Sequence, residues 1–150
     1  MVTKRRRTSA RPPGAAIAPE GRTLDLVVED NADLRELYST YFTFHGFRVQ
    51  TASDGQVALT QAVECTPDLI VTDLSMPHLG GWEMTRRLKH DPRTAHIPVL
   101  ACTGDALGTS AERALDAGCD GYVVKPCMPE DLLREARRLL ERSFARRRSA

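Results

Sequence analysis

Short apolar runs alternate with amphipathic helical patterns five times between residues 23 and 143, and this alternation constrains the fold more than any other feature. Each apolar run is followed by apolar residues at helical spacing, as in the last predicted helix at residues 129–143. Strands that alternate with helices in this way predict a parallel sheet with helices on both faces. The predicted strands, rich in β-branched side chains, are residues 24–28, 47–51, 69–72, 97–103 and 121–124.

Right-handed crossovers between parallel strands leave few topologies for such a chain. We expect an α/β fold of the flavodoxin-like (βα)5 type, which is a doubly wound parallel sheet with strand order 2-1-3-4-5. Ligands of this fold bind in a crevice at the carboxyl ends of the first and third strands. The side chains that follow residues 24–28 and 69–72 are therefore the first candidates for a functional site.

Turn and capping residues predict where several helices begin and end. Gly46 and Gly118 should end the first and fourth helices, because glycine readily adopts the left-handed conformation that closes a helix. Ser53 and Gln56 have the spacing of a capping box at the start of the second helix. The apolar face of the last helix fades at Ser143, where we expect that helix to give way to a basic end.

The charge distribution divides the 150-residue chain into an acidic body and two basic ends. Residues 1–22 carry six lysines and arginines against one glutamate, and they are predicted to form a disordered basic tail. Residues 23–143 are expected to form one domain, and residues 144–150 a basic C-terminal end. The tail could be a solubilising segment, or it could touch nucleic acid or an acidic partner.

Several protein classes can be set aside from the sequence. No apolar run is long enough to span a membrane, and no apolar segment of a secretory signal follows the basic start. The four cysteines form no C-x-x-C pair, and no histidine lies at zinc-ligand spacing from them. A reduced, cytoplasmic compartment fits this cysteine usage best.

Acidic side chains directly follow the two strands that border the expected crevice. Glu29 and Asp30 come after residues 24–28, and Asp73 ends the run 69–72. Three carboxylates in one partly dry crevice repel each other unless a hard cation binds them, and an all-oxygen ligand set suits Mg²⁺. Taken alone, each acid could simply cap the helix that follows it.

The same strand order brings a hydroxyl group and an ammonium group to this edge. Thr103 ends the fourth strand and Lys125 follows the fifth. A carboxylate nucleophile, a metal ion, a hydroxyl donor and a lysine are together the components of phosphoryl transfer. Each residue could be an ordinary strand-end or surface residue by itself, but all five at one edge predict phosphoryl-transfer chemistry.

Across the whole predicted domain, the sequence resembles the receiver domains of two-component response regulators. This resemblance implies that Asp73 is the phosphoacceptor and that Lys125 holds the phosphoryl group. It also implies a Mg²⁺ ion bound by Asp30, Asp73 and the backbone carbonyl of Ser75. Glu29 would assist this ion through a water molecule. The matching motifs are Val27-Val28-Glu29-Asp30-Asn31, Asp73-Leu74-Ser75-Met76-Pro77 with Gly81, Thr103, and Tyr122-Val123-Val124-Lys125-Pro126.

The resemblance further implies a conformational switch that runs through Thr103 and Tyr122. Thr103 would move toward the phosphoryl oxygen, and Tyr122 would swing inward into the vacated space. This movement would reshape the face made by the fourth helix, the fifth strand and the fifth helix. The alternative is that Tyr122 has no switching role and is an ordinary half-buried aromatic residue of the fifth strand. The Lys125-Pro126 bond is expected to be cis, and Asp105 is expected to alter the lifetime of the phosphoryl group.

These expectations describe a stand-alone response regulator receiver that signals by protein contact. It would accept its phosphoryl group from a phosphohistidine of a sensor histidine kinase or a histidine phosphotransfer protein. It would be no enzyme beyond catalysing its own phosphorylation and dephosphorylation. The stand-alone interpretation rests on the short segment after the fifth helix, which could not hold a DNA-binding module. The sequence does not name the downstream protein target, and it leaves open whether phosphorylation produces a homodimer.

Two other classes of function compete with this one. A phosphatase with an Asp nucleophile, like the haloacid dehalogenase-like enzymes, needs the pattern D-x-D, but Ser75 stands where its general acid would lie. The second class is a protein that binds nucleic acid or a partner through its basic ends, although the acidic body argues against an extended basic face. We expect neither a membrane nor nucleic acid among the partners.

Overall fold

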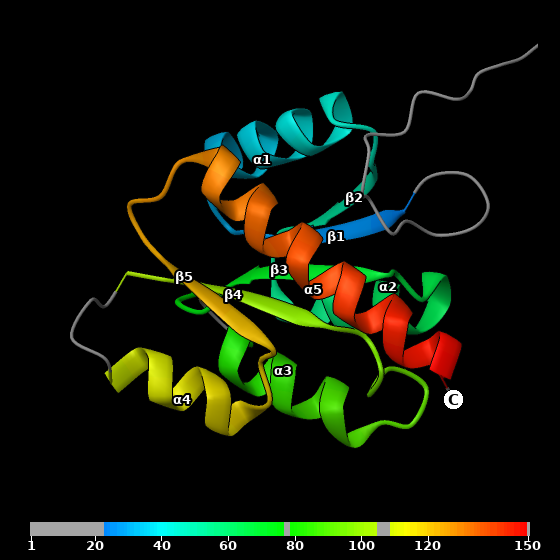
Figure 1. The fold of residues 1–150 in the computed structure, drawn as a ribbon. Coiled ribbons are helices and arrows are strands. Elements are labelled where there is room, and N and C mark those ends of the chain that lie inside the picture. The colour runs from blue at the N-terminus through cyan, green and yellow to red at the C-terminus, as the bar shows by residue number, and fades with distance from the viewer. Residues whose placement is uncertain (1–22, 77–78, 105–108, 150) are drawn as a thin grey trace, which may run out of the picture.

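The computed structural model describes residues 23–76, 79–104 and 109–149, without the side chains of residues 109–111. Five strands and five helices alternate along this part of the chain (Figure 1). The strands are β1 (Leu24–Val28), β2 (Arg48–Ala52), β3 (Leu69–Asp73), β4 (Val99–Thr103) and β5 (Gly121–Val124). The helices are α1 (Ala32–Phe44), α2 (Gly55–Cys65), α3 (Gly81–His90), α4 (Thr109–Ala117) and α5 (Pro129–Ser149). The predicted tail at residues 1–22 and the hypothesis on Asp105 lie outside the described residues.

The five strands form one parallel sheet in the order β2-β1-β3-β4-β5, so the predicted flavodoxin-like fold is confirmed. Helices α1 and α5 cover one face of the sheet, and α2, α3 and α4 cover the other (Figure 1). The strand order reverses its direction of growth at β1, because β2 and β3 pair with opposite edges of β1. The crevice of this fold therefore opens between the carboxyl ends of β1 and β3.

Two apolar clusters, one on each face of the sheet, form the core. Successive side chains of a strand point to opposite faces. Leu26 and Ile70 accordingly belong to the cluster under α2 and α3, whereas Val27 and Val71 belong to the cluster under α1 and α5. Burial on both faces explains why these strands are nearly continuous apolar runs in the sequence.

Capping interactions confirm some of the predicted helix ends and correct others. Gly46 and Gly118 have φ angles of 96° and 105°, in the left-handed region expected at the ends of α1 and α4. The capping box predicted for Ser53 and Gln56 is wrong. Helix α2 is instead capped by Asp54, whose carboxylate accepts the backbone N–H of residue 57 at 2.9 Å. A charged acceptor at the positive end of a helix is the stronger cap.

Helix α5 does not give way at Ser143 as predicted but continues to Ser149. Phe144 is buried in the cluster under α1 and α5, so the apolar face of the helix extends past the predicted end. The Arg147 guanidinium lies 5.3 Å from the centre of the Phe144 ring, and its Nη1 atom is 3.9 Å from the Asp68 carboxylate. Arginines in the last turn also interact favourably with the negative end of the helix dipole.

Two smaller differences concern the strands and α1. Strand β4 begins at Val99 instead of residue 97, because Pro98 has no N–H to donate to a neighbouring strand. Leu37 of α1 is apolar but 47% exposed, and Tyr38 and Phe42 carry the buried face of that helix. None of the described helices combines the length and the apolar character that crossing a bilayer requires.

Candidate functional site

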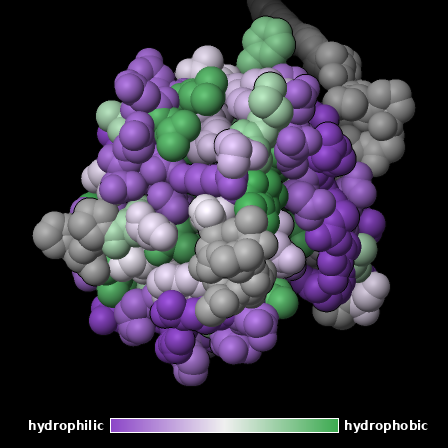
Figure 2. Space-filling view, turned by 90° about the vertical axis from the view of Figure 1, so that its left-hand side faces the viewer, coloured by the Kyte–Doolittle hydropathy of each residue, from purple (hydrophilic) through white to green (hydrophobic). Residues whose placement is uncertain are grey.

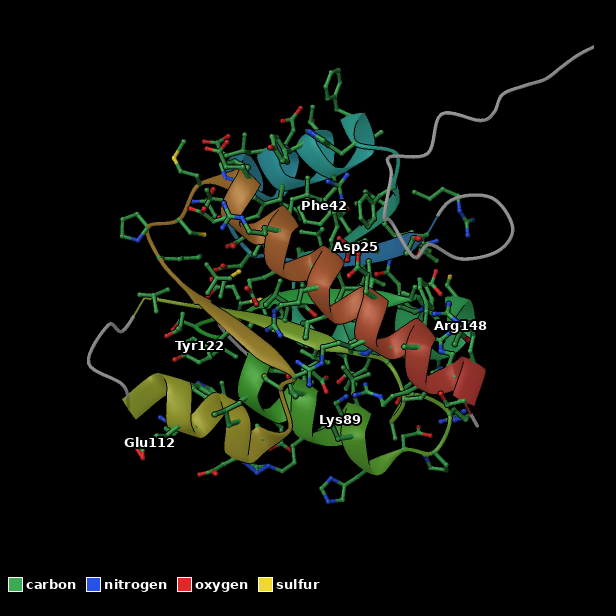
Figure 3. The ribbon with its side chains drawn as sticks, in the orientation of Figure 1. Asp25, Phe42, Lys89, Glu112, Tyr122 and Arg148 are labelled. Atoms are coloured by element: carbon green, nitrogen blue, oxygen red, sulfur yellow. The ribbon has the colours of Figure 1, made fainter. Side chains whose placement is uncertain are left out.

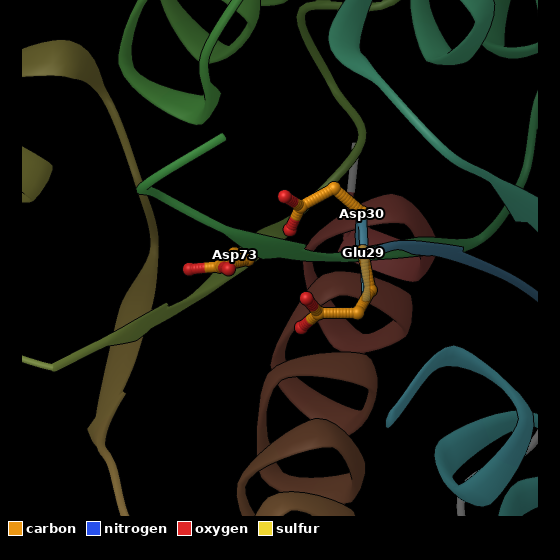
Figure 4. A group of neighbouring side chains, drawn as sticks. All are labelled: Glu29, Asp30 and Asp73. Carbon is orange, nitrogen blue, oxygen red and sulfur yellow. The ribbon is translucent and has the colours of Figure 1, made fainter. Parts of the chain in front are cut away.

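Three carboxylates meet at the carboxyl edge of the sheet, as the strand order predicts. Asp73 is the last residue of β3, and Glu29 and Asp30 directly follow β1. One carboxylate oxygen from each residue lies within 4.8 Å of the other two. Figure 4 shows the three side chains extending into the same space beyond the strand ends. The sheet topology alone therefore gathers acids that are more than forty residues apart in the sequence.

The three acids differ in how far they are withdrawn from solvent. Glu29 and Asp73 are buried, whereas Asp30 is exposed at the mouth of the crevice. The Asn31 N–H donates to Glu29 Oε2 at 3.2 Å, and the Ser75 N–H donates to Asp73 Oδ1 at 3.1 Å. Each buried carboxylate is thus held by a backbone donor two residues further along the chain.

Lys125 joins the two buried carboxylates from the other side of the crevice. Its Nζ atom is 3.3 Å from Glu29 Oε1 and 3.4 Å from Asp73 Oδ2. The backbone N–H of Lys125 donates to the Thr103 carbonyl at 2.6 Å, which fixes the start of the connection after β5. The Lys125-Pro126 bond is cis, as expected.

Burial and charge shift the pKa values of this group in a consistent way. Burial raises the pKa of Glu29, and the nearby Asp73 raises it further, while the Asn31 N–H and Lys125 act in the opposite direction. Burial alone would lower the pKa of Lys125, but Asp73 and Glu29 together raise it above its ordinary value. Lys125 is therefore firmly protonated, whereas Glu29 still lacks full charge compensation.

The donor set fits a small divalent cation. Three carboxylates share the crevice with one ammonium group, so the crevice carries excess negative charge. All the side-chain donors are oxygens in an open cleft, which is the environment that Mg²⁺ prefers. The fourth predicted ligand, the backbone carbonyl of Ser75, belongs to a residue whose N–H already contacts Asp73, and its role as a ligand stays a prediction.

Thr103 and Tyr122, the predicted switch residues, lie in different surroundings. Thr103 is buried at the end of β4, next to the end of β3, where Asp73 pairs with Cys102. Tyr122 is 41% exposed on β5 and lies outside the cluster of carboxylates. The structure thus brings Thr103 to the predicted edge and places Tyr122 on the surface.

Two further residues shape the site, and the sequence analysis missed both roles. The Arg35 guanidinium on α1 donates to the Glu29 carbonyl at 2.8 Å and lies 3.5 Å from that of Asp30, so it holds the backbone of both acids. Gly81 begins α3 directly against β3, and a side chain there would collide with the Asp73 carbonyl. The Gly80-Gly81 pair was the available signal for this close approach, whereas no local pattern marks Arg35.

The protein surface around the site is mostly polar. Figure 2 views the molecule from the left-hand side of Figure 1, where the connection from β5 to α5 lies. Hydrophilic residues cover most of this face, and the hydrophobic residues visible there form small separate patches. The described part of this face therefore suits charged ligands better than apolar ligands.

The fold and the site together define a flavodoxin-like α/β domain with an acidic crevice whose oxygen donors fit a divalent cation. A family model described as "Response regulator receiver domain" matches residues 26–137. The chain therefore belongs to the receiver domains of two-component response regulators.

Individual relatives agree with this assignment. The polar-differentiation response regulator DivK of Brucella anthropi is 37% identical over 101 residues, which are 67% of this chain and 82% of DivK. The DNA-binding dual master transcriptional regulator RpaA of Synechocystis is 38% identical over 120 residues, which are 79% of this chain and 49% of RpaA. The chain spans about half the length of the first curated relatives it matches.

A solved receiver domain gives a structural parallel for the acidic crevice. The receiver domain of the sensor histidine kinase PA1611 from Pseudomonas aeruginosa superposes with a TM-score of 0.74 and 29% sequence identity. The match covers 80% of this chain and 98% of that domain. The PA1611 structure has a magnesium ion coordinated in its active site cleft.

Proposed function

We propose that this receiver is a phosphorylation switch in which Asp73 accepts a phosphoryl group. The observation that carries the proposal is the position of Lys125, whose ammonium group lies 3.4 Å from Asp73 Oδ2 inside a crevice of carboxylates. A lysine in this place can neutralise the oxygens of a phosphoryl group on Asp73. Asp73 is also the acid at the strand end that faces the crevice, so a donor can approach it from solvent.

The reaction forms one bond and breaks another. A carboxylate oxygen of Asp73 attacks the phosphorus of a phosphohistidine, and the P–N bond to the imidazole breaks as the new O–P bond forms. The electron pair of the broken bond stays on the imidazole nitrogen, which takes a proton from solvent. The donor would belong to a sensor histidine kinase or a histidine phosphotransfer protein.

The residues around Asp73 divide the remaining tasks. The Ser75 N–H orients the Asp73 carboxylate, and Lys125 moves from that carboxylate to the phosphoryl oxygens. A Mg²⁺ ion held by Asp30, Asp73 and the Ser75 carbonyl, with Glu29 assisting through water, would neutralise further charge on the phosphoryl group.

The signal would leave the site through Thr103 and Tyr122. Thr103 would move toward the phosphoryl oxygen, and Tyr122 would turn inward and reshape the face made by α4, β5 and α5. The exposed position of Tyr122 supports this role, because an exposed side chain still has an inward position to adopt. A downstream protein would read the new shape of this face.

We further propose that the receiver acts in the cytoplasm by protein contact, without turnover of a separate substrate. DivK is a precedent for a response regulator that consists mostly of such a domain, since the match covers 82% of it. Neither competing function is favoured, because the chain belongs to the receiver family and Ser75 replaces the general acid of an Asp-based phosphatase.

The test is incubation with acetyl phosphate and Mg²⁺, followed by intact mass measurement. We expect one added phosphoryl group on the wild type, and none without Mg²⁺ or in Asp73→Asn. Asp116→Asn, which changes an exposed acid on α4, is the matched control and should be phosphorylated like the wild type. An adduct of equal yield in Asp73→Asn would overturn the proposal.

A further inference from the structure

A cavity of about 370 Å³ lies at the edge of the sheet opposite the three carboxylates. Its lining comes from the end of α3, the segments that precede β4 and β5, and the last turns of α5. Because α5 runs antiparallel to the strands, its C-terminal turns reach this edge, and Lys89 lies below α5 in Figure 3. The polar lining residues are Lys89, His96, Asp120, Ser143, Arg146 and Arg147.

One wall of the cavity is a fixed and internally neutral ion pair. Lys89 Nζ lies 3.0 Å from Asp120 Oδ2 and donates to the carbonyls of Ile97 at 2.7 Å and Ala95 at 3.3 Å. Asp120 also accepts the Val99 N–H at 2.8 Å. The three N–H bonds of Lys89 are thereby used, so this pair shapes the cavity and leaves the binding of a ligand to other groups.

Two exposed arginines bring guanidinium groups to the mouth of the cavity, and one of them has a long ion pair. Arg147 lies 3.9 Å from the Asp68 carboxylate, beyond hydrogen-bond distance, and is stacked on the Phe144 ring. Within the described ranges, no carboxylate lies within ion-pair distance of Arg146. Ser143 is buried beside these arginines and offers a hydroxyl group from the same helix. The mouth is therefore positively charged and rich in donors.

The same charged groups act on His96, which also lines the cavity. Burial lowers the pKa of His96, Arg147 and Lys89 lower it further, and Asp68 opposes them. His96 is thus neutral near pH 7, and the cavity disfavours an additional positive charge. A bound anion would add negative charge next to His96 and so raise the pKa of its imidazole.

We propose that this cavity binds the phosphate group of a small phosphate monoester, between Arg146 and Arg147. The planar, forked donors of arginine match phosphate oxygens, and Ser143 and His96 can add neutral hydrogen bonds. The volume falls within the range of ordinary ligand pockets, so it has room for an organic group as well as the phosphate. The site is separate from Asp73 and does not depend on the proposed phosphorylation.

The first experiment measures binding at pH 7.5 in EDTA, by following backbone amide NMR signals of Ser143 and Arg146. Glycerol 3-phosphate and inorganic phosphate are titrated at constant ionic strength against sodium chloride. We expect saturable shifts with glycerol 3-phosphate, and weaker binding of inorganic phosphate. Equal affinities for the two compounds would assign the site to free phosphate and overturn the proposal of an ester ligand. Shifts no larger than those in sodium chloride would overturn the proposal of an anion site.

Two variants of exposed arginines on α5 separate a built site from general charge. Arg146→Gln removes a lining guanidinium, whereas Arg142→Gln makes the same charge change one turn earlier, outside the cavity. We expect Arg146→Gln to weaken binding about five-fold and Arg142→Gln to weaken it less than about two-fold. Equal weakening by both variants would reduce the effect to overall charge and contradict the proposal.

His96 provides a second readout. Sulfate stays a dianion across the pH range in which histidine titrates, so it can replace phosphate in a pH series. Saturating sulfate should raise the pKa of His96 by about half a unit or more relative to chloride, since a bound anion favours the imidazolium. An unchanged pKa would show that the anion does not occupy this cavity.

Discussion

Strand β1 contains one buried acid and is directly followed by another, and the two have opposite environments. Glu29 is 2% exposed at the carboxyl end, where Lys125 and the Asn31 N–H contact its two oxygens. Asp25 is fully buried near the other end of the strand, and it lies between α1 and α5 in the view of Figure 3. In the described part of the structure, neither carboxylate oxygen of Asp25 has a hydrogen-bond partner. One acid belongs to a site, and the other lies unpartnered in the core.

The pKa values express the same difference. Burial raises the pKa of both groups. For Glu29 a backbone donor and Lys125 oppose the effect of burial, whereas for Asp25 the nearby Asp68 adds to it. Burial therefore favours the neutral form of Asp25 in the folded protein, while the carboxyl edge has partners for charged side chains. The comparison shows that burial by itself does not make a functional acid, because a functional acid also needs partners for its charge.

Removing the ammonium group of Lys125 from the carboxyl edge should have the largest effect, a loss of phosphorylation rate. In Lys125→Met, Asp73 and Glu29 lose their common partner, and the transferring phosphoryl group loses a neutralising charge. We expect the rate of phosphorylation by acetyl phosphate to fall about a hundred-fold. Lys125→Arg keeps the charge and should be affected less. A rate within a few-fold of wild type in Lys125→Met would remove lysine from the mechanism.

Removing the unpartnered acid Asp25 should stabilise the protein instead of impairing it. Asp25→Leu replaces an unsatisfied carboxyl group with an apolar side chain among the apolar neighbours of α1 and α5. We expect the free energy of unfolding at pH 7 to rise by about 2 kcal/mol, measured by urea denaturation. Phosphorylation should be unchanged. Destabilisation by Asp25→Leu would mean that this carboxyl group has a partner and that the comparison with Glu29 fails.

The pH dependence of stability should sharpen the contrast. The folded-state pKa of Asp25 is raised above its ordinary value of 3.8, so the folded state retains a proton that the unfolded state has lost. Wild-type stability should therefore fall relative to Asp25→Asn as the pH rises above that value, by up to about 1.4 kcal/mol per pH unit. The difference should level off above the folded-state pKa. A difference that is constant from pH 4 to pH 8 would contradict the assignment.

Addition of Mg²⁺ should give the smallest effect, a gain in the free energy of unfolding that depends on the carboxylates at the carboxyl edge. At a concentration three times its Kd, a cation that binds the folded state alone raises the free energy of unfolding by about 0.8 kcal/mol. We expect this gain in Asp25→Asn, which keeps the acidic crevice, and its loss in Asp73→Asn. Equal stabilisation of both variants, measured by thermal unfolding, would place the cation elsewhere.

The fold and the carboxyl edge could be predicted because both follow from local patterns and topology. The apolar runs fix the strands, the strand order fixes which strand ends meet, and Glu29, Asp30 and Asp73 stand at those ends. Lys125 comes to the same edge by the same rule, since it follows β5.

The remaining features depend on contacts between distant elements. The spacing of Arg35 does not reveal that its guanidinium reaches the backbone of Glu29. Asp25 interrupts an apolar run, but only the folded structure shows that its carboxylate is buried without a partner among the described residues. The helix end at Ser143 was misplaced because the burial of Phe144 depends on the cluster under α1 and α5.

The most direct test of the central claim is to trap the phosphorylated side chain. Borohydride reduces an acyl phosphate to an alcohol, so a phosphorylated aspartate becomes homoserine, which peptide mass spectrometry can locate. After treatment with acetyl phosphate and Mg²⁺, we expect homoserine at position 73 and unmodified side chains at Asp25, Glu29 and Asp30. Reduction at any of those three acids, with position 73 unmodified, would contradict the central claim.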